Sequence, residues 1–202
     1  MLQSIKKIAL ATLLGAMLTG CAGFAGNRLP AMDTAKIQAP QSAAKTGFAY
    51  TYSVGRANEG DSIKHAQVRR LEATAPAVKL FLDNMNKSGY FNQPSDASDL
   101  KIDVRVVEVA DPNAMVGAMI TGATFGIVPS WITIESHFDV KVTSKGKEYN
   151  YSLIDDMTMV QWLPMALLFP FNNPLEDVPN AIKSNAWNNL ISKMKADGII
   201  GA

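Results

Sequence analysis

The sequence predicts an α+β domain: a mostly antiparallel sheet of about four strands with helices packed on one face. Three observations predict this class. Several segments alternate apolar and polar residues as strands do, two segments repeat apolar residues at helical spacing, and a short turn joins two alternating segments. The predicted order is strand, helix, strand, apolar insert, strand, strand, apolar insert, helix. We expect a single domain over residues 47–202, because no internal repeat divides the chain.

The strands are predicted from alternation. The first strand places aromatic and aliphatic side chains on one face, at Phe48, Tyr50, Tyr52 and Val54. The second alternates over 100–106, and its phase slips at Val106 and Val107, which predicts a bulge. The third and fourth flank a turn at 144–147 that contains Gly146, and this arrangement is typical of a β-hairpin.

The helices are predicted from apolar spacing. Apolar residues recur every three or four positions from Ile63 to Met85, but Pro76 interrupts them. Either one helix kinks at Pro76, or a second helix begins there with the proline in its first turn. Gly89 is the expected left-handed cap of this segment. A last helix is predicted over 179–196, with Gly198 as its stop.

Residues 1–20 have the layout of a secretory signal peptide, with two lysines, an uncharged segment over 8–17 and small residues before Cys21. The uncharged segment is too short to cross a bilayer, since ten helical residues reach about 15 Å. Leu18-Thr19-Gly20-Cys21 resembles the lipobox of Gram-negative bacterial lipoproteins. The resemblance implies cleavage before Cys21, a diacylated thiol and acylation of the new amine, with chains such as palmitate. Ala22, where an aspartate would favour the inner membrane, implies outer-membrane sorting with the domain in the periplasm.

Residues 21–46 are rich in small and polar residues and contain Pro30 and Pro40. We expect a flexible tether that holds the domain away from the membrane.

Two inserts carry no charge, 112–134 and 157–175, and we expect them to emerge at the same end of the sheet because the hairpin joins them. Three interpretations stay open: buried core, a surface for a partner or for self-association, or contact with the membrane. The candidate contact residues are the large apolar members of both inserts: Met115, Met119, Phe125, Trp131, Trp162, Leu167 and Phe169.

Composition excludes several functions. The 19 basic residues are balanced by 18 acidic residues and form no cluster, which argues against nucleic-acid binding. His65 and His137 lack zinc-ligand spacing, and we expect both to be surface or structural residues. Asp155 and Asp156 would point to opposite faces of a strand. With no catalytic motif in the sequence, we expect no enzymatic activity, no metal and no cofactor apart from the covalent lipid at Cys21.

The order strand, helix ending at Gly89-Tyr90, strand and glycine-rich apolar stretch, over about residues 48–143, is similar to that of surface-exclusion lipoproteins and, more loosely, of the curli secretion channel. This architectural resemblance implies oligomerisation and no particular site residue. The sequence therefore predicts an outer-membrane lipoprotein that acts as a non-catalytic binding or assembly component of a cell-envelope complex. The alternatives are a homo-oligomeric membrane-inserting lipoprotein of pore or surface-exclusion type, and a lipid or ligand carrier.

Overall fold

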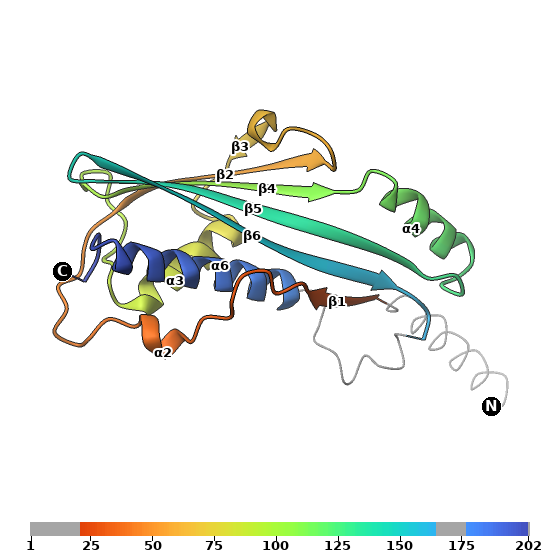
Figure 1. Ribbon diagram of the computed structural model, residues 1–202, viewed down its shortest axis with the longest axis horizontal. Helices are drawn as coiled ribbons and strands as arrows, with labels where there is room; N and C mark the ends of the chain where they lie inside the picture. The colour runs from red at the N-terminus through yellow and green to blue at the C-terminus, as the bar shows by residue number, and fades with distance from the viewer. Residues whose placement is uncertain (1–20, 165–176, 202) are drawn as a thin grey trace, which may run out of the picture.

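The computed structural model describes residues 21–164 and 177–201 (Figure 1). The predicted signal peptide, 1–20, and the candidate contact residues Leu167 and Phe169 lie outside the described residues. The elements in chain order are β1 (Cys21–Ala25), α2 (Thr34–Ile37), β2 (Ala49–Asn58), the 3-10 turn η1 (Ile63–His65), β3 (Val68–Arg70), α3 (Pro76–Ser88), β4 (Lys101–Ala110), α4 (Ala114–Ala123), β5 (Ser130–Ser144), β6 (Lys147–Gln161) and α6 (Asp177–Ala196).

The α+β class is confirmed, but the sheet has more strands than the predicted number of about four, and it is mixed. The described residues form one six-stranded sheet in the order β1-β6-β5-β4-β2-β3. The sheet is mixed, because β2 and β4 run parallel while the other neighbouring strands run antiparallel. A parallel pair needs a crossover, which α3 supplies between β2 and β4. The two unpredicted strands, β1 and β3, have five and three residues, too few for alternation to be recognised.

The helix α3 begins at Pro76, as one of the two sequence interpretations requires. Ala75 has an extended backbone, which is the conformation favoured before proline. The helical spacing from Ile63 onward is therefore misleading, since residues before Ala75 form only η1 and the short strand β3. Gly89 caps α3 with a φ of 78°, as predicted.

The bulge predicted at Val106 and Val107 is wrong, because the register of β4 on β5 is continuous from Lys101 to Ala110. Both valines are buried because both faces of the sheet are covered at this point. Val106 belongs to the core beneath the helices. On the other face the segment before β3 crosses the sheet, where the Arg105 guanidinium donates hydrogen bonds to the carbonyls of Ile63 and Ala66.

The β-hairpin is confirmed. Lys145 and Gly146 both have positive φ, 50° and 77°, which is the backbone of a two-residue type I′ turn. The strand β6 continues to Gln161, so the first five residues of the second predicted insert, 157–161, belong to the sheet.

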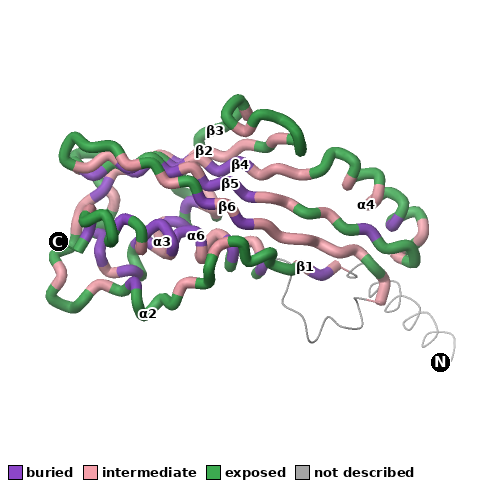
Figure 2. Tube along the Cα trace, viewed as in Figure 1, coloured by how far each residue is buried: buried purple, intermediate pink, exposed green. Residues whose placement is uncertain are grey.

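The core lies between the sheet and the helices α3 and α6, which pack on the same face (Figures 1 and 2). Trp187 of α6 is fully buried, and three rings surround it with centroids between 5.2 and 5.9 Å away: Tyr52, Phe81 and Phe138. Such edge-to-face contacts add about 0.5–1.5 kcal/mol per pair to the burial of the rings. The end of α6 at Ala196 and a positive φ at Gly198 are as predicted.

The structure also differs from the predicted tether over 21–46. Cys21–Ala25 forms the edge strand β1 against β6, and Ile37 of α2 is buried in the core. Asn185 and Asn189 of α6 donate side-chain hydrogen bonds to the carbonyl of Pro30. The small residues that resemble a linker in the sequence allow this close packing, since Gly23 lies against Val178.

Candidate functional site

Ten large apolar side chains are exposed at one end of the sheet. They come from β1, α4, the loop after α4, the start of β5 and the residue after β6 (Figure 1). Among the described residues, Val68 is the only other exposed large apolar side chain. We call this surface the apolar end; its members are Phe24, Met115, Val116, Met119, Ile120, Phe125, Ile127, Val128, Trp131 and Trp162.

The helix α4 is inverted relative to an ordinary surface helix, because its small residues face the sheet and its large apolar residues face outward. Ala114, Gly117, Ala118 and Thr121 are buried or half-buried, and a side chain at Gly117 would contact Ser130. Met115 and Met119 are 72% and 70% exposed on the other side. The core interpretation of the first insert is therefore wrong for this helix. The face of small residues packs α4 against the sheet, and the face of large apolar residues is available for contact with another molecule.

The loop after α4 holds Phe125 outward. Phe125 has a left-handed backbone with a φ of 51°, and its side chain is 77% exposed. The next residue, Gly126, accepts a 2.8 Å hydrogen bond at its carbonyl from the amide of Leu163, which follows β6. This bond confirms that the two inserts meet at the same end of the sheet, within the described residues.

Cys21 lies in the last row of the sheet. It is the register partner of Gln161, and Gln161 in turn pairs with Ser130 at the start of β5. Trp131 and Trp162 are the neighbours of these last two residues. The structure therefore brings the predicted lipidation site together with five of the predicted contact residues: Met115, Met119, Phe125, Trp131 and Trp162.

A row of charged residues marks where the apolar end stops. The segments that build this end, 21–27, 112–134 and 157–164, contain no charged side chain. Glu135 and Asp156 are register partners, and Arg28 forms ion pairs with both. This row lies five residues beyond the last row on β5 and β6, which is roughly 17 Å along the strands.

Behind this row, Asp155 and His137 have structural roles. Asp155 is buried, and its Oδ1 accepts hydrogen bonds from the amides of Arg28 at 2.9 Å and Asp156 at 3.0 Å. The two side chains thus have separate partners: backbone amides for Asp155, and the Arg28 guanidinium for Asp156. His137 is buried, not on the surface, and its Nε2 contacts Glu135.

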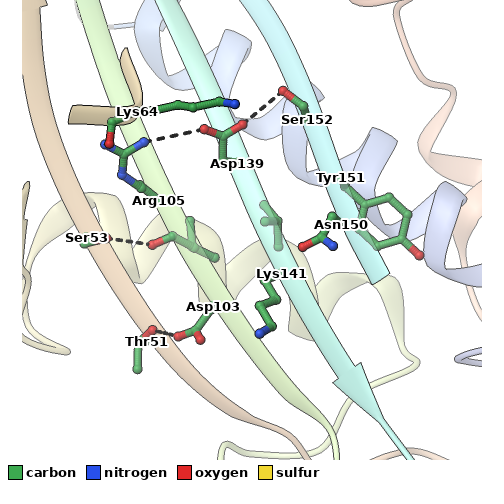
Figure 3. Close-up of a pocket in the computed structure, with 12 residues that line it drawn as sticks. Thr51, Ser53, Lys64, Asp103, Arg105, Asp139, Lys141, Asn150, Tyr151 and Ser152 are labelled. Carbon is green, nitrogen blue, oxygen red and sulfur yellow. Dashed lines mark hydrogen bonds and ion pairs between the residues drawn. The ribbon is translucent and has the colours of Figure 1, made fainter. Parts of the chain in front are cut away.

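A polar groove of about 540 Å³ lies on the sheet face opposite the helices (Figure 3). Arg105 and Asp139 form an ion pair at 3.7 Å, Ser152 donates to Asp139 at 3.0 Å, and Thr51 bonds to Asp103. Lys64 and Lys141 add positive charge. The groove offers hydroxyl, carboxylate and ammonium groups to a polar ligand. Sequence reasoning missed it, because the groove depends on the parallel pairing of β2 with β4, which alternation within a single strand does not reveal.

A second groove of about 570 Å³ lies beside α4, where this helix meets the ends of β2, β4 and β5. Its lining is mixed. Apolar side chains of Ile132, Ile134 and Met159 lie near the charged side chains of Arg56, Glu108 and Asp111.

In the described part of the chain, no group of three or more His, Cys, Asp or Glu side chains is arranged to hold a metal ion. None of the helices in this part of the chain has both the length and the apolar character needed to cross a bilayer. Neither the known protein families nor the curated proteins contain a match to this chain.

Proposed function

We propose that this protein is an outer-membrane lipoprotein with its domain in the periplasm, serving as a non-catalytic binding or assembly component of a cell-envelope complex. One observation carries the proposal: Cys21, which the lipobox-like sequence marks for acylation, lies in the same last row of the sheet as the apolar end. A protein acylated there would present its exposed apolar residues at the membrane to which it is anchored.

The position of Cys21 also orients the domain. Because β1 begins at Cys21 and pairs with β6, the anchor joins the sheet directly, without an intervening linker. The strand β5 then leads away from the anchor over 15 residues, about 50 Å. Asp139 and Lys141 of the polar groove lie about 30 and 36 Å along this strand. Anchoring confines such a domain to the membrane plane and raises its effective concentration near membrane-bound partners, for which the polar groove is accessible.

The test is metabolic labelling of the full chain, with a C-terminal tag, in a Gram-negative host given a palmitate analogue. We expect label on the native chain in the outer-membrane fraction, and no label on Cys21→Ser. Ala22→Ser, which changes the neighbouring residue, is the matched control and should keep the label. An unlabelled native chain, or label that persists on Cys21→Ser, would contradict the proposal.

A homo-oligomeric, membrane-inserting assembly is the second candidate, and the outward apolar face of α4 favours it. Light scattering of the tagged native protein in mild detergent distinguishes the two. A single defined stoichiometry above one supports the assembly, and a monomer supports the binding component. The groove beside α4, which combines apolar and charged side chains, favours a third candidate, a lipid carrier, for which mass spectrometry should find a phospholipid bound in equal amount to the purified protein.

A further inference from the structure

We propose that the apolar end docks into the lipid leaflet that holds the Cys21 acyl chains, with α4 and the loop 124–128 inserted among the lipids. This inference rests on the proposed function, since it takes Cys21 to be acylated. It names the membrane itself, and not a protein, as the partner of the apolar end.

The first argument is the hydrogen bonding of the loop after α4. Inside lipid every backbone N–H needs an internal acceptor, because no water is present to supply one. Five consecutive amides, 124–128, each donate within the segment, to Ile120 O, Gly122 O, Thr121 O, Thr124 O and Thr124 Oγ1. The next residue is Pro129, which has no N–H.

The polar side chains of the same segment are satisfied in the same way. The hydroxyl of Thr121 donates to the carbonyl of Gly117 at 3.1 Å, and the hydroxyl of Thr124 donates to that of Ile120 at 2.9 Å. An exposed loop in water has no need to pair its polar groups internally, and a protein partner could supply acceptors of its own. Internal pairing of every amide from 124 to 128 and of both threonine hydroxyls, in a segment with large outward apolar side chains, is what a lipid environment requires of hydrogen-bond donors.

The second argument is size. The hydrocarbon core of a bilayer is about 30 Å thick, so one leaflet contributes about 15 Å. The ten residues of α4 are about 15 Å long. The charged row of Arg28, Glu135 and Asp156 lies roughly 17 Å behind the last row of the sheet, so it stays outside the leaflet when α4 and its loop insert. The length of α4 therefore matches one leaflet and not a whole bilayer.

The third argument is the placement of β1, of the two exposed tryptophans and of Cys21. Within residues 21–164 and 177–201, no strand pairs with the outer edge of β1, which places this strand at the headgroup level and leaves insertion to α4 and its loop. Trp131 and Trp162 adjoin Ser130 and Gln161 in the last row of the sheet, level with Cys21, and indole rings favour the membrane–water interface. Cys21, at the tip of β1, is then at the depth where acyl chains begin.

The experiment uses the acylated full chain, purified in detergent and reconstituted into vesicles of phosphatidylethanolamine and phosphatidylglycerol, with or without brominated acyl chains that quench indole fluorescence. The protein carries Trp131→Phe and Trp162→Phe, so that buried Trp187 is the only native indole. One variant adds F125W, and its matched control adds K147W at the opposite end of the hairpin. Trp187 emission reports that each protein is folded, and I127W replaces F125W if the latter does not fold.

We expect brominated lipid to quench at least half of the emission added by F125W, and none of that added by K147W. An acylated protein whose F125W emission is equal in both lipids overturns the docking and leaves the proposed function standing. If that protein is also a defined oligomer, the apolar end belongs to an interface between copies. A mass without acyl groups at Cys21 overturns the proposed function together with the docking, and mass spectrometry of each preparation separates these cases.

Discussion

Cys21 lies directly opposite Gln161 in the β1–β6 ladder. Because Gln161 also pairs with Ser130, one row across three strands joins the predicted acylation site to the turn region after α4. The apolar end is therefore a property of the tertiary fold: it combines segments that are more than 90 residues apart in the chain. Its packing, and that of the core behind it, can be tested by substitution.

The docking of α4 depends on Gly117. Gly117→Leu should weaken the packing of α4 on β5 by about 1–3 kcal/mol, because the new side chain has to displace Ser130. Gly122→Ala, on the same helix but with open space around it, should instead stabilise α4 by about 0.5–1 kcal/mol through helix propensity. Amide hydrogen exchange of residues 114–123 measures both effects. Equal hydrogen exchange in the two variants would show that the face of small residues does not hold α4 against β5.

The Arg28 ion pairs hold the end of β1 against the sheet. Arg28→Met should lower the local stability of β1 by no more than about 1 kcal/mol, since the arginine is half exposed and exposed ion pairs are weak. Faster hydrogen exchange of the β1 amides is the expected signal. Arg56→Met is the control, because Arg56 is 90% exposed and lies 4.0 Å from Glu108. If both variants leave β1 exchange unchanged, backbone pairing alone retains this strand.

The aromatic core should be far more sensitive to truncation than the apolar end. Trp187→Ala removes a fully buried ring and should cost about 3–5 kcal/mol of the free energy of unfolding. Trp131→Ala removes a ring that is 67% exposed and should change it by less than about 0.5 kcal/mol. Urea denaturation of the two variants provides the comparison. A large loss for Trp131→Ala would mean that this ring supports the fold.

Alkaline pH should destabilise the protein through Tyr52. Burial raises the pKa of the Tyr52 hydroxyl, and the negative charge of Glu108 raises it further. The unfolded chain releases this proton near pH 10 while the folded chain retains it, so stability falls as pH rises above about 10. Tyr52→Phe should match the native protein at pH 7 and lose less stability between pH 10 and 11. Thermal unfolding across this pH range measures the difference between the two proteins. If the native protein and Tyr52→Phe lose stability equally, Tyr52 is not the cause.

Local patterns in the sequence were sufficient for part of this fold. The hairpin follows from alternation around Gly146, and the ends of α3 and α6 follow from Gly89 and Gly198, because each signal is local. The strand β1 could not be predicted, since its five residues gain their structure from β6, over 130 positions away. The exposure of α4 was also beyond prediction: an uncharged helix can be buried or exposed, and only packing shows that Gly117 faces inward and Met119 outward.

The position of β1 at the sheet edge has a consequence for the order of maturation. Under the proposed processing, enzymes must reach residue 21 to acylate it and to cut the chain before it. The ladder from Cys21 to Ala25 can then close on β6 only after these enzymes release the chain. Until that release, the outer edge of β6 from Met157 to Gln161 is open, and open edges pair readily with other strands. The sheet is therefore completed only after the anchor, and a precursor stalled before cleavage should be the aggregation-prone form.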